Sequence, residues 1–129
     1  MDFLIHYLVA AAIFVVIDAV WIGVVANKFY KAQMGELLAK KPRFAPAVIF
    51  YALYIVAIIV FIVQPNLADG SIGVVIGQSA LLGAAMYATY DLTNLSTLKN
   101  WPIKVTIVDM IWGTFITTLV STLTFLLFR

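Results

Sequence analysis

Cysteine is missing from this sequence of 129 residues, and histidine occurs once, as His6. Without cysteine the chain forms no disulfide, thiolate metal site or thiol nucleophile. A single histidine argues against a zinc site, which needs several nitrogen, sulfur or carboxylate ligands. The Gly-rich phosphate loop, the G-x-S-x-G elbow and the H-E-x-x-H helix are also absent from the sequence. The sequence therefore predicts no cofactor and gives little support to an enzyme.

Charged side chains are scarce as well. They make up 11% of the chain, and hydrophobic residues make up 64%, whereas about a quarter of the residues in soluble domains are charged. A water-soluble fold of this length cannot bury so much apolar surface. We therefore expect one compact domain whose solvent is the lipid bilayer.

Four long apolar runs extend over most of the chain. They cover residues 3–25, 44–63, 71–90 (or as far as 98) and 102–128. About 20 helical residues cross the hydrocarbon core of a bilayer, and a helix satisfies its own backbone hydrogen bonds there. The sequence predicts an all-α integral membrane protein, a single bundle of four transmembrane helices.

The basic residues indicate the orientation of this bundle. Five of them lie between the first two runs, Lys99 and Lys104 flank the connection between the last two, and the middle connection has none. Because Lys and Arg are retained on the cytoplasmic side, we expect the first and third connections there and both termini on the other side. This rule accounts for the basic residues without a nucleic-acid partner.

Three of the six acidic residues, Asp18, Asp91 and Asp109, fall within or at the edge of the apolar runs. Asp18 precedes the end of the first run by 7 residues, and Asp109 follows Pro102 by 7. At about 1.5 Å per residue, both lie roughly 10 Å below the cytoplasmic boundary. Asp91 joins the same layer if its helix continues to residue 98. Tyr87, Tyr90 and Asn94 are near Asp91 by helical spacing.

Two of these acids belong to a repeated D-x-x-W pattern, "VVIDAVWIG" and "TIVDMIWGT". The two helices run in opposite directions, so we expect Trp21 on the cytoplasmic side of Asp18 and Trp112 on the outer side of Asp109. A charged side chain in hydrocarbon costs at least about 2.5–3.5 kcal/mol, and neighbouring carboxylates resist joint ionisation. A shared proton, a bound cation or water must therefore compensate the negative charge of these carboxylates. An oxygen-only cation site stays open, with no metal specified.

Other features have two interpretations each. The acids could pin helices together instead of lining a cavity. The tryptophans, with Tyr30, Tyr51 and Tyr54, fit an aromatic belt at the boundary or a cage for a cation. "GVVIG", from Gly73 to Gly77, matches the G-x-x-x-G pattern of close helix packing. We expect that face to pack inside the bundle, with dimerisation as the alternative.

Several segments together resemble a family of predicted four-span bacterial membrane proteins known only as a domain of unknown function. They are "DAVWIGVVANKFYKAQMGELL", "FYALYIVAIIVFIVQP", "GAAMYATYDLTNLSTLKNWP" and "VDMIWGT". The likeness extends over nearly the whole chain, and "YATYDLTNLSTLKNWP" is its most specific part. It implies a multi-pass protein of the bacterial inner membrane, and it implies no substrate, reaction or catalytic residue.

The leading hypothesis is an acid-lined cavity open to the cytoplasm that binds a small cationic or polar solute, or moves it with protons. Its expected lining residues share a polar or aromatic side chain near the acid layer. They are Asp18, Asp91, Asp109, Trp21, Trp112, Tyr87, Tyr90 and Asn94. Expected partners are the lipid bilayer, the solute or a proton, and a second copy or a larger membrane complex. The alternative is a structural, accessory or lipid-binding protein, and an enzyme acting on lipid is the least favoured.

Overall fold

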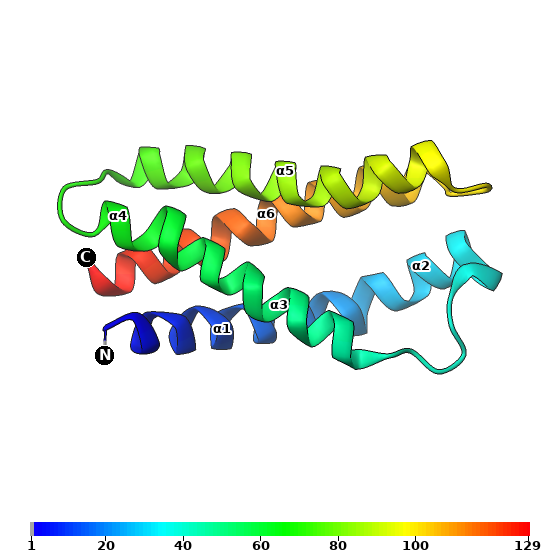
Figure 1. Ribbon diagram of the computed structural model, residues 1–129, viewed down its shortest axis with the longest axis horizontal. Helices are drawn as coiled ribbons and strands as arrows, with labels where there is room; N and C mark the ends of the chain where they lie inside the picture. Colours follow the sequence, from blue (N-terminus) through cyan, green and yellow to red (C-terminus); the bar gives the residue numbers. More distant parts are fainter. Residues whose placement is uncertain (1) are drawn as a thin grey trace.

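The computed structural model describes residues 2–129 and consists of helices joined by short connections (Figure 1). The elements are α1 (Asp2–Trp21), η1 (Ile22–Ala26), α2 (Asn27–Met34), η2 (Gly35–Leu37), α3 (Phe44–Ile58), η3 (Ile59–Val63), α4 (Gln64–Asn66), α5 (Ile72–Thr97) and α6 (Ile103–Phe128). Successive elements merge, so that four continuous helices are long and apolar enough to cross a membrane: Asp2–Leu37, Phe44–Asn66, Ile72–Thr97 and Ile103–Phe128. The predicted all-α, four-span architecture is confirmed.

The first helix differs most from its prediction, because it continues to Leu37 instead of ending near Val25. Its extension "NKFYKAQM" is polar, but Lys, Ala, Gln and Met are strong helix formers. An apolar run marks the part of a helix that lies in lipid, and the helix itself can extend beyond the lipid. Its α-helical part ends at Met34, and the 3-10 turn η2 that follows begins at Gly35, whose φ of 47° is readily adopted only without a side chain.

The other boundaries are closer to the sequence. The third helix ends at Thr97, which is the longer of the two predicted ends. Before the last helix, Asn100 turns the chain with a φ of 64°, and Pro102 occupies the N-cap position of α6. Asn tolerates this left-handed conformation better than most residues.

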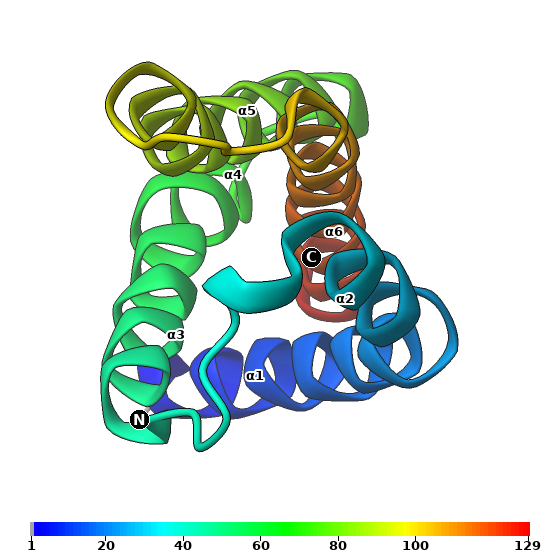
Figure 2. The ribbon, with the colours of Figure 1, turned by 90° about the vertical axis from the view of Figure 1, so that its right-hand side faces the viewer.

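The four helices form a ring when viewed along the bundle (Figure 2). α1 lies between α6 and α3, and α5 lies next to α6. The termini and the 67–70 connection lie at one end, and connections 38–43 and 98–102 lie at the other (Figure 1). We call the second end the basic end, since seven of the eight Lys and Arg residues lie in its connections or flanking helical turns. In Figure 2 the 3-10 turn η2 and the chain after it cross the middle of the ring at this end.

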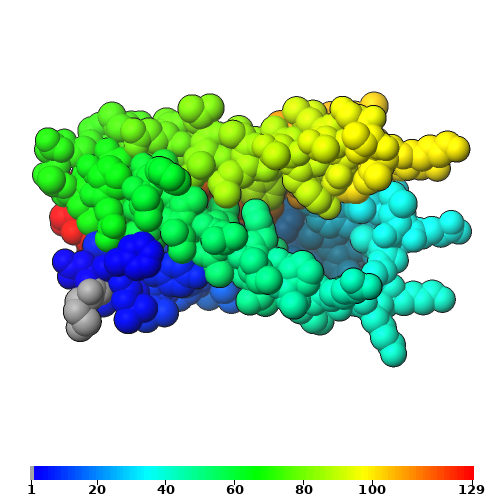
Figure 3. All heavy atoms as spheres, in the orientation of Figure 1, coloured from blue at the N-terminus to red at the C-terminus, as the bar shows by residue number. Residues whose placement is uncertain are grey.

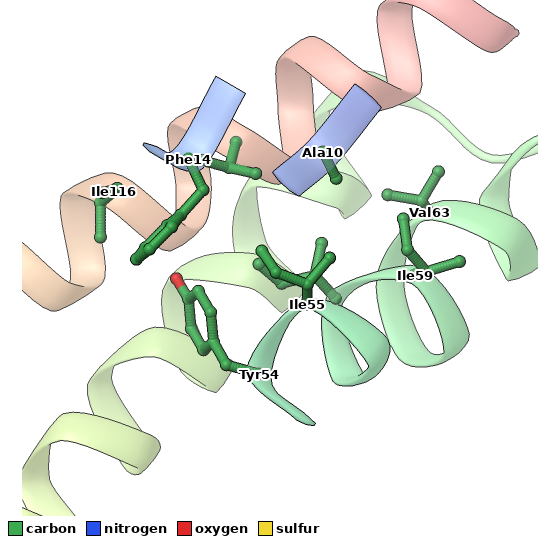
Figure 4. Packing of buried hydrophobic residues seen from close by; sticks show 9 residues of the cluster. Ala10, Phe14, Tyr54, Ile55, Ile59, Val63 and Ile116 are labelled. Atoms are coloured by element: carbon green, nitrogen blue, oxygen red, sulfur yellow. The ribbon is translucent and has the colours of Figure 1, made fainter. Parts of the chain in front are cut away.

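The core lies where α3 and η3 pack against α1 and α6 (Figure 4). Its members include Ala10, Phe14, Ile58 and Ile116, and all are buried. Tyr54 is fully buried among them, and its hydroxyl shares a hydrogen bond of 2.5 Å with Thr117 Oγ1. Its assignment to an aromatic belt was therefore wrong: the hydroxyl has a buried partner on α6 and does not need the interface.

Glycines bring α5 and α6 into close contact, but at a site the sequence did not indicate. A side chain at Gly83 would overlap the Gly113 carbonyl and Thr117, and one at Gly113 would overlap the Tyr87 ring. Around Gly77 there is open space, and Gly73 has only its neighbour Ser71 within reach. The prediction that the G-x-x-x-G face packs inside the bundle is wrong, because that face of α5 points away from α6.

α3 stays close to α5 only near η3. From there the two helices diverge toward the basic end (Figure 1), and the space-filling view shows a hollow between them (Figure 3). This hollow leads to the acid layer.

Candidate functional site: an acid-lined cavity

Two adjoining cavities lie in the half of the bundle nearer the basic end. One, of about 340 Å³, is lined by the first helix and α6, and the other, of about 730 Å³, lies between α3 and α5. Both are lined by Tyr51, Tyr87 and Asp109. Asp109 thus faces the point where the two cavities meet.

Asp109 is held by Tyr30, which the sequence analysis considered for an aromatic belt or a cation cage but did not count among the expected lining residues. The hydroxyl of Tyr30 donates a hydrogen bond of 2.7 Å to Asp109 Oδ1. Tyr30 lies in α2, the part of the first helix that the prediction had placed in a loop. The available signal was the helix-forming composition of residues 27–34, which allows Tyr30 to point back toward the bundle.

A π-helical turn, η1, makes this contact geometrically feasible. Tyr30 follows Asp18 by 12 residues, and in an α-helix about 12 residues make 3.3 turns, which would put the two side chains on different faces. The π turn takes up one extra residue. The remaining spacing is close to three whole turns, and Asp18, Ala26 and Tyr30 line the same cavity.

Asp91 is the least solvated of the three acids. Its side chain is fully buried, and within residues 2–129 neither carboxyl oxygen has a hydrogen-bond partner. It lies beside the Asp109 carboxyl. A buried polar group without a partner is costly, so this carboxyl needs a proton, a water or a ligand to satisfy it.

The backbone around Asp91 is fixed by α6. The Trp101 indole donates a hydrogen bond of 3.0 Å to Thr106 Oγ1, and that hydroxyl donates one of 3.5 Å to the Asp91 carbonyl. Trp101 is buried, and its ring meets Tyr90 edge-on. These contacts hold the end of α5 against the start of α6.

The two D-x-x-W motifs meet, as expected of neighbouring antiparallel helices. Asp18 lines the smaller cavity beside the Trp112 side chain. The rings of Trp21 and Trp112 stack, with centroids 4.3 Å apart and planes 7° from parallel. The expectation that the indoles lie on opposite sides of the acids is therefore wrong. Side chains lean toward the N-terminus of their helix, and in antiparallel helices this lean brings the two rings together.

The remaining predicted site residues differ in their placement. Tyr87 lines both cavities, and the absence of a side chain at Gly113 leaves room for its ring. Tyr90 lines the larger cavity and is exposed. Asn94 lies beside Tyr90, one turn nearer the basic end, and lines neither cavity.

The lining of the two cavities combines carboxylates with aromatic rings. Among residues 2–129 no three His, Asp or Glu side chains are grouped so that they could hold a metal ion. Carboxylates beside aromatic rings can bind an ammonium group, which donates hydrogen bonds to oxygen and is attracted to ring faces.

The opposite end of the bundle has polar contacts of a structural kind. His6 is buried between Gln64 and the Phe128 ring. A hydrogen bond of 3.2 Å joins Gln64 Nε2 and His6 Nδ1. Asn66 donates hydrogen bonds to Gln78 and to the Ile62 carbonyl. These contacts secure the connection between α4 and α5, far from the acids.

Residues 3–126 match the family model described as predicted membrane protein (DUF2177), a family of unknown function. The chain belongs to this family, in agreement with the resemblance seen in its motifs. No curated protein and no solved structure matches it.

Proposed function

We propose that this multi-pass membrane protein binds a small organic cation in the acid-lined cavity. Asp109 supplies the countercharge at the point where the two cavities meet, and Asp18 supplies it in the smaller cavity. Asp91 lines neither cavity and is buried beside Asp109. Tyr51 and Tyr87 offer aromatic faces and hydroxyls to the same space.

One observation carries this proposal: the fully buried carboxyl of Asp91, without a hydrogen-bond partner among residues 2–129, beside Asp109. Purely structural polar groups in proteins are usually satisfied by protein partners. An ammonium group donates several hydrogen bonds and can satisfy neighbouring carboxylates at once.

Binding of this kind also allows coupling to protons. A cation and a proton compete for the same carboxylates, so each favours release of the other. If the basic end faces the cytoplasm of a bacterium, as the distribution of Lys and Arg and the sequence resemblance imply, the exchange takes place on that side of the inner membrane. Proton-coupled transport is the extension of the binding proposal.

The binding proposal is tested with protein in nanodiscs. Methylammonium binding is measured by isothermal titration calorimetry for the wild type, Asp109→Asn and Asp91→Asn, with the exposed Asp69→Asn as matched control. We expect binding by the wild type and the control, stronger at neutral than at acidic pH, and loss of binding in the two site variants. Binding unchanged in folded Asp109→Asn and Asp91→Asn would refute the proposal.

A structural role is the second candidate, and the hydrogen bond from Tyr30 to Asp109 favours it. In that role the acids connect the first helix to α6 without a ligand. Asp109→Asn would then lower the unfolding temperature of the ligand-free protein, whereas the binding role predicts a folded protein that no longer responds to cations.

A further inference from the structure

The larger cavity has a second opening, toward the side of the bundle. α3 and α5 are neighbours in the ring (Figure 2), and the hollow between them reaches the surface (Figure 3). The walls of this cavity include Pro46, Ala47 and Phe50 from α3 and Met86 from α5. These residues belong to helices that can cross a membrane. The side opening therefore has apolar walls on two helices that are long enough to cross a membrane.

The fixed charges favour this opening over the aqueous one for an ammonium group. The basic end carries seven Lys and Arg residues, and one of them, Arg43, lines the larger cavity itself. Positive charges at an entrance repel cations that approach through water. Of the three acids, Asp109 lines this cavity.

We propose that the ligand is an amphiphilic organic cation, an ammonium group with an alkyl or aryl tail, that enters between α3 and α5 from the bilayer. This inference rests on the proposed function and names its ligand class and route. The ammonium lies between Asp109 and the rings of Tyr51 and Tyr87, and the tail lies against Phe50 and Met86.

The dimensions and the polar groups of the site agree with this ligand. The volume of about 730 Å³ is in the range of about 300–1,000 Å³ typical of pockets for drug-sized molecules. Asp91, buried and without a hydrogen-bond partner in the described chain, adjoins the acid that receives the ammonium. A hydrophilic cation would leave the apolar walls of the side opening without a role.

The test distinguishes the contribution of the apolar tail to binding from that of the ammonium group. Binding of methylammonium and n-hexylammonium is compared in nanodiscs, with the signal of empty nanodiscs subtracted. Ala47→Trp fills the side opening, and Ala45→Trp places the same side chain on an exposed position of α3 that does not line the cavity. We expect Ala47→Trp to weaken hexylammonium binding by about tenfold, as overpacking of a fitted site does. Ala47→Trp should weaken methylammonium binding much less, because methylammonium has no tail to displace, and Ala45→Trp should change neither.

Each other outcome has a distinct meaning. Equal binding of hexylammonium by Ala47→Trp and the wild type, with methylammonium binding still dependent on Asp109, would overturn the seating of the tail in the side opening, and with it the lateral route, and leave the proposed function intact. Binding of both cations independent of Asp109 would overturn the proposed function itself. Retained methylammonium binding shows that Ala47→Trp is folded; if it does not fold, Met86→Trp fills the cavity from the opposite wall.

Discussion

The indoles of Trp21 and Trp112 stack face to face, 4.3 Å between ring centroids, and join the first and last spans of the bundle. Each belongs to a D-x-x-W motif, and the Trp112 side chain also lies beside Asp18. Packing between the first and last spans and the position of the Asp18 side chain therefore depend on the same pair of rings. Aromatic contacts of this kind contribute about 0.5–1.5 kcal/mol beyond the burial of their area.

Replacing the two tryptophans singly and together should reveal this coupling. We expect Trp21→Leu and Trp112→Leu to destabilise the protein non-additively, with a coupling energy of about 0.5–1.5 kcal/mol in a double-mutant cycle of unfolding in detergent. Phe61→Leu, an exposed aromatic residue of η3, serves as control. Strictly additive effects would show that the stacked rings do not stabilise one another.

Tyr30→Phe removes the hydroxyl that binds Asp109 and keeps the ring. Because this hydrogen bond connects α2 to α6, its loss should increase amide hydrogen exchange in residues 27–37 and leave the core of α6 unchanged. A hydrogen bond to a charged group is worth about 1.5–3 kcal/mol. Tyr7→Phe, which loses a bond to the Ala52 carbonyl at a more exposed position, is the matched control. Identical exchange in the two variants would mean that Tyr30 does not hold the extension in place.

Glycine substitutions should distinguish the two small-residue faces of α5. Gly83→Ala places a methyl group against the Gly113 carbonyl and Thr117, whereas Gly77→Ala meets open space. We expect Gly83→Ala to lower the free energy of unfolding by about 1–3 kcal/mol and Gly77→Ala to leave it unchanged. The comparison uses thermal unfolding in one detergent. Destabilisation by Gly77→Ala that increases with protein concentration would indicate a dimer through the G-x-x-x-G face.

The absence of cysteine allows a direct test of orientation. Single cysteines at Lys40 and Ser71 lie at opposite ends of the bundle. In intact bacteria expressing the protein, a maleimide that does not cross the inner membrane should label Ser71→Cys, and it should label Lys40→Cys only after lysis. The reverse pattern would place the basic end outside and contradict the positive-inside assignment.

The fold could be predicted because apolar run length is set by membrane thickness. The runs at 44–63 and 102–128 became helices with nearly those bounds, Phe44–Asn66 and Ile103–Phe128. Counting along the helices predicted that Asp18 and Asp109 lie in one layer, and the two residues line the same cavity. Helix direction could be inferred in the same way, since four spans joined by short connections must alternate.

Side-chain contacts between helices were harder to foresee. Gly73 and Gly77 fit a packing motif, but which face of α5 meets α6 depends on the rotation of the helix, and Gly83 occupies that contact instead. Tyr30 was missed because hydropathy ends at the lipid boundary, whereas helical hydrogen bonding does not. The stacking of Trp21 and Trp112 depends on side-chain lean, which a count of residues along the axis leaves out.

The π turn between Ile22 and Ala26 has a consequence for comparing chains of this family. It divides the first span into two stretches. In the second stretch, the residues that face the bundle are shifted by one sequence position relative to an uninterrupted α-helix. A related chain that lacked one residue in this turn would keep a span of sufficient length, yet its basic-end half would be rotated by about 100°. A different set of residues would then point at the acids. An insertion or deletion in a single helical turn, with no substitution at Asp18 or Asp109, would suffice to change what the cavity accepts.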